Sequence, residues 1–307
     1  MDRRTFLAAS SSALIGTVLT GTQSASAATA ALSVRATPGG PLLTPTDKFF
    51  AYSQMRYPEN FPTGVAIDGL VNTPARYSID ELGKLATIKK IMTLECFVNT
   101  AGGPLIFNTP FEGVPLSALF DKAGIKPEAK SARIETSDGH PPFLLPLSEL
   151  QRKETMLVAK HGDVAVPMRH GSPFTRLFIP GAGGNHHPKW VTRITLVANA
   201  APEHPAPPMA GFLKPTPPEV VTTMAGVTLT GYAFTGAEPV GKVEFSTDNG
   251  YTYRPMPLPP QPDPDVWITW DVTFKPPEPG FYVLRVKATS ASGRKQDFPG
   301  VIAVEVR

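Results

Sequence analysis

The chain has a single cysteine, Cys96, and this side chain limits the chemistry that the sequence can support. One cysteine cannot form an internal disulfide. It also cannot supply a Cys-x-x-Cys zinc site, a cysteine-ligated iron–sulfur cluster or the Cys-x-x-Cys-His attachment of a c-type haem. A lone cysteine is ordinarily a small buried apolar side chain, whereas a thiolate is a nucleophile or a soft metal ligand.

Three kinds of site could use Cys96 as a reactive thiolate. A cysteine hydrolase needs a base beside the thiol, and no cysteine-protease signature surrounds this residue. A type-1 copper site needs a short Cys-to-His spacing, which is absent after Cys96. A soft thiolate followed by the polar turn 99–103 also suits a molybdenum site. In such a site a dithiolene provides most of the sulfur ligands, and one protein sulfur completes the coordination of the metal. Five histidines could supply the base that a cysteine hydrolase needs: His140, His161, His170, His186 and His187.

The elements that must position these residues are short strands separated by turns. Residues 90–96 alternate as a strand that ends at Cys96. Ser78 and Glu81 form a capping box that predicts a helix start, and residues 114–123 predict a short amphipathic helix that ends at Gly124. Further strands are expected at residues 133–136, 143–145, 177–179 and 191–197. The 35 prolines and 26 glycines disfavour long helices.

A second domain is expected after a proline-rich stretch at residues 201–218, which has the composition of a linker. Beyond it the pattern is purely β, with turns such as that at residues 248–250. This spacing predicts a small immunoglobulin-like sandwich over residues 219–307. Residues 28–45 are expected to form a loose arm before the first domain, which spans residues 45–200.

The N-terminal residues 1–27 have the pattern of a Tat signal peptide. Arg3 and Arg4 precede an apolar stretch that is too short and too rich in Ser and Thr for a convincing membrane span, and residues 25–27 offer a cleavage site. An ordinary secretory signal or a membrane anchor is the alternative. We therefore expect export to the periplasm and a soluble mature protein. The net charge of +3, without a long basic run, argues against nucleic acid as a partner.

Residues 93–99 (Thr-Leu-Glu-Cys-Phe-Val-Asn) resemble the Thr-Leu-x-Cys-x-Gly-Asn segment around the molybdenum ligand of sulfite oxidases and sulfite dehydrogenases. Other segments resemble the same family in the same order along most of the mature chain: residues 111–116, 137–139, 170–176, 180–181, 189–190 and 246–253. On these segments the chain is identified as a member of the sulfite oxidase superfamily.

The resemblance implies an α+β sulfite-oxidase-type molybdopterin-binding domain followed by an all-β immunoglobulin-like dimerisation domain. It implies molybdenum–molybdopterin as the cofactor and Cys96 as the metal ligand. Arg176 and Lys189 would bind the terminal phosphate, because a planar guanidinium fork and a point charge both suit phosphate oxygens. The remaining cofactor-binding positions implied by the family are Ser53, Gln54, Asp138, His170 and His187.

The sequence departs from the family around the metal. Sulfite enzymes place two arginines and a tyrosine there, and the matching positions hold Tyr52, Ala101 and Val158. Phe111 takes the place of a pocket tryptophan, so Tyr52 and Phe111 are expected to line the catalytic pocket. A sulfite dianion without fixed cations would bind poorly, since burying an unpaired charge costs several kcal/mol. Sulfite is therefore not the expected substrate, although Arg169 or His186 could replace the lost charge.

Three functions remain open on the sequence. The first is a periplasmic dehydrogenase that transfers oxygen to a sulfur-centred small molecule. Because no haem motif is present, its electrons would pass to a separate protein such as a c-type cytochrome. The second is a reductase of sulfoxides or other oxo-compounds, and the third is a degenerate module that only binds a ligand or partner. The resemblance also implies a possible homodimer through the C-terminal sandwich.

Overall fold

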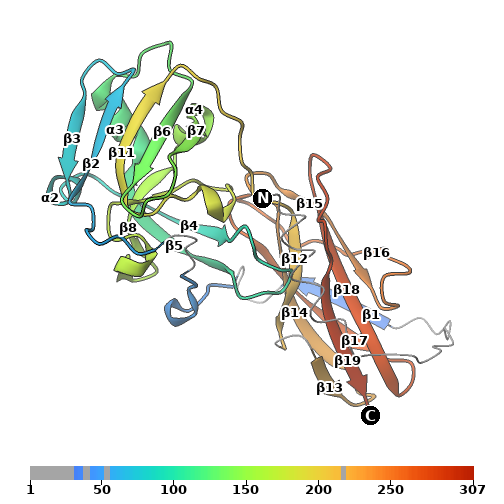
Figure 1. Cartoon of the computed structure of the whole chain (residues 1–307). Helices are drawn as coiled ribbons and strands as arrows, with labels where there is room; N and C mark the ends of the chain where they lie inside the picture. The colour runs from blue at the N-terminus through green and yellow to red at the C-terminus, as the bar shows by residue number, and fades with distance from the viewer. Residues whose placement is uncertain (1–30, 37–41, 52–55, 216–218) are drawn as a thin grey trace. The chain divides into compact units, whose positions relative to one another are not determined.

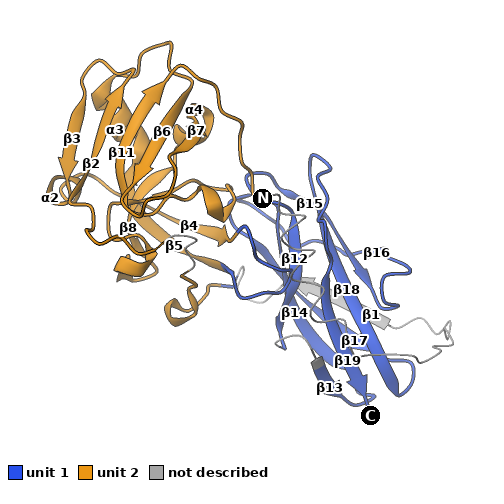
Figure 2. Cartoon of the chain, viewed as in Figure 1, with its two compact units in different colours: residues 1–42, 97–106, 207–307 blue, residues 43–96, 107–206 orange. Residues whose placement is uncertain are grey.

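The computed structural model describes residues 31–36, 42–51, 56–215 and 219–307, and its chain divides into two compact units (Figures 1 and 2). Unit 1 consists of Met1–Leu42, Phe97–Ile106 and Pro207–Arg307, and unit 2 of Leu43–Cys96 and Phe107–Ala206. The signal peptide expected at residues 1–27 lies outside the described residues.

Unit 2 is built from two five-stranded sheets. Sheet I has the order β10-β8-β5-β4 with β9 beside β8, and sheet II has the order β3-β2-β11-β6-β7. The strands of sheet I are β4 (Ile88–Glu95), β5 (Ile106–Pro115), β8 (Met156–His161), β9 (Val164–Ala165) and β10 (Arg176–Phe178). Those of sheet II are β2 (Gly64–Gly69), β3 (Ala75–Ser78), β6 (Ser131–Thr136), β7 (Phe143–Pro146) and β11 (Val191–Val197).

The helices of unit 2 are short: α2 (Ile79–Leu82), α3 (Leu116–Ala123) and α4 (Leu147–Leu150). The capping box is confirmed, because the Ser78 hydroxyl accepts from the Glu81 amide and the Ser78 amide donates to the Glu81 carboxylate. The predicted end of α3 is also confirmed, with Gly124 in the left-handed conformation at φ 66°. The domain is thus mostly β, with fewer helical residues than an α+β description suggests.

Sheet I is buried on both faces, which explains its near-continuous apolar strands. On one face Leu157 and Leu177 join the main core, which sheet II and α3 complete. On the other face Met156 and Phe178 join a second, aromatic core. This aromatic core consists of Phe49, Met92, Leu94, Phe107, Phe111, Met156, Val158, Val166 and Phe178.

A β-bulge in β8 changes which residues face the aromatic core. Phe111 pairs with His161 and Gly113 pairs with Val158, so β8 carries one residue more than β5 over this stretch. Residues 158 and 161 would point to opposite faces of a regular strand. The extra residue places His161 on the same face as Val158, which is opposite Arg176 on β10.

Unit 1 contains two sheets that share one core, which makes it a β sandwich. The four-stranded sheet has the order β1-β17-β14-β12, and the five-stranded sheet has the order β13-β19-β18-β15-β16. The strands are β1 (Ala31–Ala36), β12 (Met209–Lys214), β13 (Glu219–Thr222), β14 (Val227–Phe234), β15 (Val240–Ser246), β16 (Arg254–Pro255), β17 (Ile268–Lys275), β18 (Gly280–Ser290) and β19 (Gly300–Val306). The immunoglobulin-like relationship stays a prediction.

The domain boundaries differ from those expected. The expected loose arm at residues 28–45 contains β1, which pairs with β17, and the expected linker at residues 201–218 contains β12, which pairs with β14. Prolines flank β12 but none lies within it, so its apolar residues can pair as an edge strand. Residues 97–106 also belong to unit 1, where the Gly102 amide donates to the Tyr232 hydroxyl.

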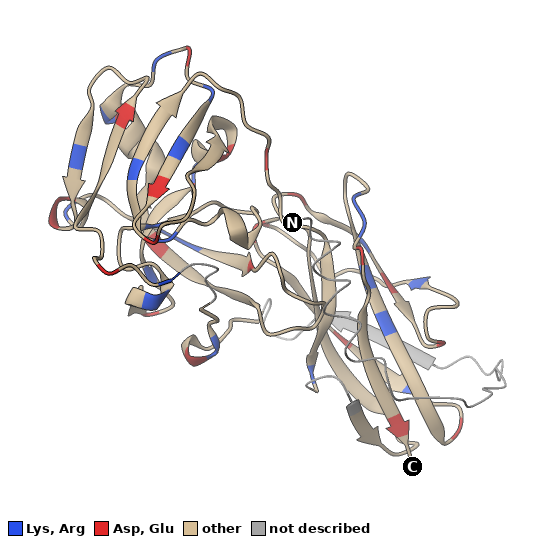
Figure 3. Ribbon diagram, viewed as in Figure 1, with Lys and Arg blue, Asp and Glu red and all other residues tan. Residues whose placement is uncertain are grey.

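Basic and acidic residues are interspersed along the ribbons of both units (Figure 3). Among the residues that the structure describes, no helix is long and apolar enough to cross a membrane.

Candidate functional site

Cys96 lies directly after the last residue of β4, as the alternation of residues 90–96 predicts. The second half of β4 is buried on both faces, and Cys96 itself is 8% exposed. The loop after β10 lies against it. A Cβ atom on Gly184 would stand 2.7 Å from the Cα atom of Cys96, so only glycine permits this approach.

A second segment brings two cationic side chains together. The 3-10 helix Met168–His170 ends at Gly171, whose φ is 119°. A Cβ atom on Gly171 would lie 3.0 Å from the Cβ of Arg176 and 3.2 Å from the Cβ of Lys189. Gly171 therefore sits between the stems of these two side chains and lets them approach each other.

The backbone around these cations is strained. Ser172, Phe174 and Trp190 have φ values of 55°, 61° and 54°, a conformation that costs non-glycine residues about 1–3 kcal/mol each. Hydrogen bonds hold it in place: the Phe174 amide donates to the Val158 carbonyl at 2.7 Å, and the Trp190 indole donates to the Met168 carbonyl at 2.9 Å. Strain of this kind is typical of functional sites.

Arg176 is a buried cation without a counter-charge. Arg176 is 5% exposed, and its Nη1 donates to the His170 carbonyl at 2.8 Å. Nε has no partner, and no carboxylate pairs with the guanidinium within the described part of the chain. Burial lowers the pKa of Arg176 to about 10, so the group remains charged at neutral pH. An unpaired buried charge costs several kcal/mol, and an anionic ligand would offset that cost.

Lys189 connects Arg176 with Cys96 electrostatically. Burial, and then the charge of Arg176, lower the pKa of Lys189 to about 7, while Cys96 and Asp138 oppose the shift. Asp138 is held in its turn because Oδ1 accepts from the Thr136 hydroxyl at 2.6 Å and from the His140 amide at 3.2 Å. The structure thus brings Cys96, Asp138, Arg176 and Lys189 into one region of unit 2.

Two buried histidines border the same region. His161 is 2% exposed and His170 is 1% exposed, and their ring centroids lie 5.0 Å apart. Burial, followed by the charge of Arg176, lowers the pKa of each to about 3, so both rings are neutral. His161 Nε2 and His170 Nδ1 are buried without a hydrogen-bond partner in the described structure.

Comparison with known proteins assigns the domain that carries these residues. Residues 58–205 match the family described as "Oxidoreductase molybdopterin binding domain". These residues therefore form a molybdopterin-binding oxidoreductase domain, of the type found in the sulfite oxidase superfamily.

One solved structure has a similar fold. The crystal structure of the sulfane dehydrogenase SoxCD from Paracoccus pantotrophus matches with a TM-score of 0.64 and 22% identity, over 76% of this chain and 68% of that chain. Murine CRIg matches with a TM-score of 0.22 and 12% identity, over 33% of this chain and 98% of that chain. The second match is too weak to support an argument about the fold.

The molybdopterin oxidoreductase needs a metal ligand and a binding site for an anionic cofactor, and the observed residues fit both needs. Among the described residues, no group of three His, Cys, Asp or Glu side chains could hold a metal ion. Cys96 can supply one sulfur ligand, which is sufficient where a dithiolene provides the others. The unpaired guanidinium of Arg176 requires the kind of anion that the phosphate of molybdopterin supplies.

Some predicted site residues have other surroundings. His187 uses both ring nitrogens within its own loop: Nδ1 accepts from the Ile179 amide, and Nε2 faces the Ala182 carbonyl, each at 3.1 Å. Its ring therefore holds the loop in place and offers no free nitrogen to the cofactor. Arg169 is exposed, although its charge acts on both His161 and His170.

Phe111, which is expected to line the catalytic pocket, lies within the aromatic core. Its ring is 1% exposed and packs on Phe178 at 4.1 Å within the aromatic core, where Val158 is also fully buried. Apolar packing of β5 on β10 therefore determines where this ring lies. Tyr52, Ser53 and Gln54 lie outside the described residues, and Ala101 belongs to the segment that clusters with unit 1.

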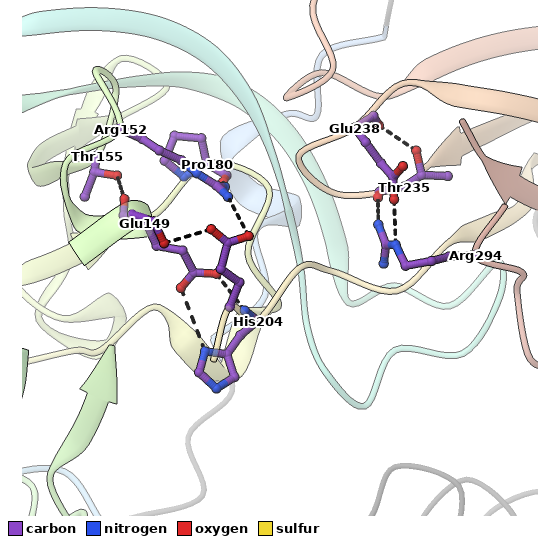
Figure 4. Close-up of polar contacts among 10 residues, drawn as sticks. Glu149, Arg152, Thr155, Pro180, His204, Thr235, Glu238 and Arg294 are labelled. Carbon is purple, nitrogen blue, oxygen red and sulfur yellow. Dashed lines mark hydrogen bonds and ion pairs between the residues drawn. The ribbon is translucent and has the colours of Figure 1, made fainter. Parts of the chain in front are cut away.

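A polar network supports the loop beside Cys96. Glu149 on α4 is fully buried, and its Oε1 accepts from the His204 amide at 2.6 Å (Figure 4). The His204 carbonyl accepts from the Gly183 amide, and the His204 ring stacks on His186 at 3.7 Å. Arg152 donates to the Pro180 carbonyl from the other side. This network fixes both ends of the glycine-rich loop.

The sequence did not indicate that His161 belongs to this region. It was one of five candidate histidines, and nothing in its spacing distinguishes it. Its position depends on the β-bulge in β8. The local feature that accompanies this bulge is Gly162, which directly follows His161 and has a φ of 62°.

Proposed function

We propose that this molybdopterin oxidoreductase is a periplasmic dehydrogenase that oxidises a sulfur-centred small molecule. The substrate sulfur would gain one oxygen atom from water, and two protons and two electrons would be released. The electrons would leave one at a time to a separate redox protein, for which a c-type cytochrome is suited. Export would follow the Tat route, which carries proteins already folded around their cofactor.

The observation that carries this proposal is the approach of Lys189 to the buried Arg176, whose Nε has no partner, around Gly171. The charges of Arg176 and Cys96 also act on Lys189, and they shift its pKa in opposite directions. A thiolate that binds a soft metal and a cation that binds phosphate thus belong to one site. A degenerate module without cofactor would gain nothing from an uncompensated buried guanidinium.

Each residue of the proposed site would have its own role toward the cofactor. When bound, the cofactor supplies the coupling of oxygen-atom transfer to electron transfer. Cys96 would ligate the metal, Arg176 and Lys189 would hold the phosphate, and Asp138 and His170 would orient the pterin by hydrogen bonds. Ser53 and Gln54, which match pterin-binding positions of the family, and Tyr52, which matches a metal-pocket position, complete the proposed site.

Two observations favour a sulfur-centred substrate that is neutral or weakly charged. SoxCD, which has a similar fold, is described as a sulfane dehydrogenase. The positions where sulfite enzymes carry two arginines and a tyrosine hold Tyr52, Ala101 and Val158 here, and Val158 is buried in the aromatic core. The pocket is therefore not built to stabilise a dianion.

We also propose that the C-terminal sandwich is immunoglobulin-like and joins two copies of the chain. Its five-stranded sheet exposes Val221, Phe281 and Val301, which an association would cover. Sedimentation equilibrium of the mature protein tests the dimer.

The function is tested by purifying the protein from a cofactor-competent host and from a host that cannot make molybdopterin. We expect about one molybdenum and one pterin per chain from the first host only, and spectral bleaching and recovery when a substrate and then an oxidised cytochrome c are added. Cys96→Ser should fold but lose turnover, because an alkoxide is a poor substitute for a thiolate. Metal-free protein from the competent host, or full turnover of the Ser variant, would contradict the proposal.

A further inference from the structure

We propose that His161 is an additional cofactor-binding residue, whose Nε2 hydrogen-bonds an oxygen of the molybdopterin phosphate beside Arg176. This inference rests on the proposed site, and it adds a residue that the sequence motifs do not mark.

The register of β8 directs His161 to the side of the sheet on which Arg176 lies. Arg176 on β10 is opposite Val158 on β8, so the two side chains share a face. The bulge between residues 158 and 161 then brings His161 to that face as well. Without the bulge, the imidazole would point to the main core on the other face of sheet I.

The ring has both apolar and polar neighbours. It lies 4.9 Å from the Phe49 ring and 6.3 Å from the Phe107 ring. It also lies 5.0 Å from the His170 ring, and the His170 carbonyl accepts from Arg176. The two phenyl rings thus hold the imidazole, while its polar neighbour is part of the predicted phosphate site.

The unsatisfied nitrogen distinguishes His161 from a structural core histidine. In this chain His187 shows the structural arrangement, because the backbone of its own loop satisfies both ring nitrogens. His161 Nε2 is as deeply buried but has no partner among the described residues. A buried polar atom without a hydrogen bond costs about 1–3 kcal/mol, and such atoms are rare unless a ligand or water completes them.

The charges around His161 favour an anion as the hydrogen-bond partner of Nε2. Arg176 lacks a counter-charge, Lys189 lies next to it, and the charge of Arg169 also acts on His161. A cation at Nε2 would be repelled by Arg176 and Arg169, so these charges disfavour a metal ion as its partner. A phosphate oxygen is attracted by the same charges and accepts a hydrogen bond from a neutral imidazole.

The test compares two substitutions at one position. His161→Phe keeps a flat ring against Phe49 and Phe107 but removes the donor, whereas His161→Gln keeps a donor. Wild-type and variant proteins would be loaded with cofactor in a competent host. Pterin release would then be followed by the fluorescence of the oxidised pterin, and the bound phosphate by ³¹P NMR.

We expect His161→Phe to release pterin about tenfold faster or more than wild type, as for the loss of one charge-assisted hydrogen bond, with a shifted ³¹P resonance. His161→Gln should fall between the two. Cofactor-free His161→Phe should melt no lower than cofactor-free wild type, which separates binding from folding. Unchanged release and an unchanged ³¹P resonance in a cofactor-loaded variant would overturn the inference, while a wild-type protein without molybdenum and pterin would instead contradict the proposed function.

Discussion

The backbone of Gly184 lies against that of Cys96, and a Cβ atom at residue 184 would stand 2.7 Å from the Cys96 Cα and 2.5 Å from the Glu95 carbonyl oxygen. Both neighbours are backbone atoms, so no side-chain rotation could relieve the clash. The loop after β10 therefore controls the position of the proposed metal ligand, although it is far from Cys96 in the sequence.

We expect Gly184→Ala to displace Cys96 and to lower turnover at least tenfold, with a smaller effect on the melting temperature. Gly183→Ala is the matched control, because a Cβ there would meet the Asn185 side chain at 3.1 Å and the His204 carbonyl oxygen at an ordinary 3.9 Å. Its φ of −66° is also ordinary for alanine. Turnover per molybdenum and the electronic spectrum of the metal would be measured. Equal activity of the two variants would show that the loop does not position Cys96.

Arg176→Ala and Lys189→Ala should lower cofactor occupancy more than they lower turnover per bound molybdenum. Each substitution removes a charge-assisted contact worth about 1.5–3 kcal/mol. The two variants should differ in stability without cofactor: removing the unpaired Arg176 charge should leave the apo protein as stable as wild type or more so. Molybdenum and pterin contents would measure the cofactor occupancy of each variant, and melting curves of the apo protein would measure its stability. Full occupancy in both variants would contradict the assignment of Arg176 and Lys189 to the phosphate.

Glu149→Ala should destabilise unit 2 by about 1–3 kcal/mol, because the partly buried His204 amide would lose its acceptor. Glu149→Gln keeps an acceptor oxygen and should cost less. Glu203→Gln provides a control: its carboxylate is 53% exposed and lies 3.8 Å from Arg152, so its ion pair contributes little. Denaturant titration of the three variants would test this order, and equal losses for Ala at residue 149 and Gln at residue 203 would contradict it.

The buried histidines should make the apo protein sensitive to acid. The pKa values of His161, His170 and His187 are lowered from 6.5 to about 3, mainly by burial. Between these values the unfolded chain binds protons that the folded chain does not, so stability is present above pH 6.5 and is lost as the pH falls toward 3. The slope is on the order of 1 kcal/mol per pH unit for each histidine.

This acid sensitivity can be assigned by substitution. The free energy of unfolding of apo wild type and apo His161→Phe would be measured between pH 7.5 and pH 5. The variant lacks one proton-binding site in its unfolded state, so its stability should fall less steeply. Parallel curves for the two proteins would show that His161 is not held neutral by burial.

Sulfite should be a poor substrate. Losing one charged hydrogen bond to a buried anion costs about 1.5–3 kcal/mol, or roughly ten- to a hundredfold in affinity, and three such positions are replaced here by Tyr52, Ala101 and Val158. Steady-state assays with an artificial acceptor would compare sulfite with thioethers and other neutral sulfur compounds. Saturation at micromolar sulfite would show that other residues rebuild an anion site.

The sequence alone determined the local elements that carry the site. Alternation in residues 90–96 predicted a strand that ends at Cys96, and the capping box at Ser78 and the glycine at residue 124 predicted helix ends that the structure confirms. These features depend on residues that are close in sequence, so propensity and periodicity are sufficient to find them. Motif order likewise indicated the cofactor class before any geometry was known.

Only the tertiary structure decided which side chains meet. The bulge in β8 that turns His161, the approach of Arg176 and Lys189 around Gly171, and the packing of Gly184 on Cys96 all join segments that are separate in the chain. The membership of β1, β12 and residues 97–106 in unit 1 depends in the same way on distant partners. Cross-strand register and long-range pairing follow from the packing of the whole domain, and a one-residue change in register reverses the face of every side chain that follows.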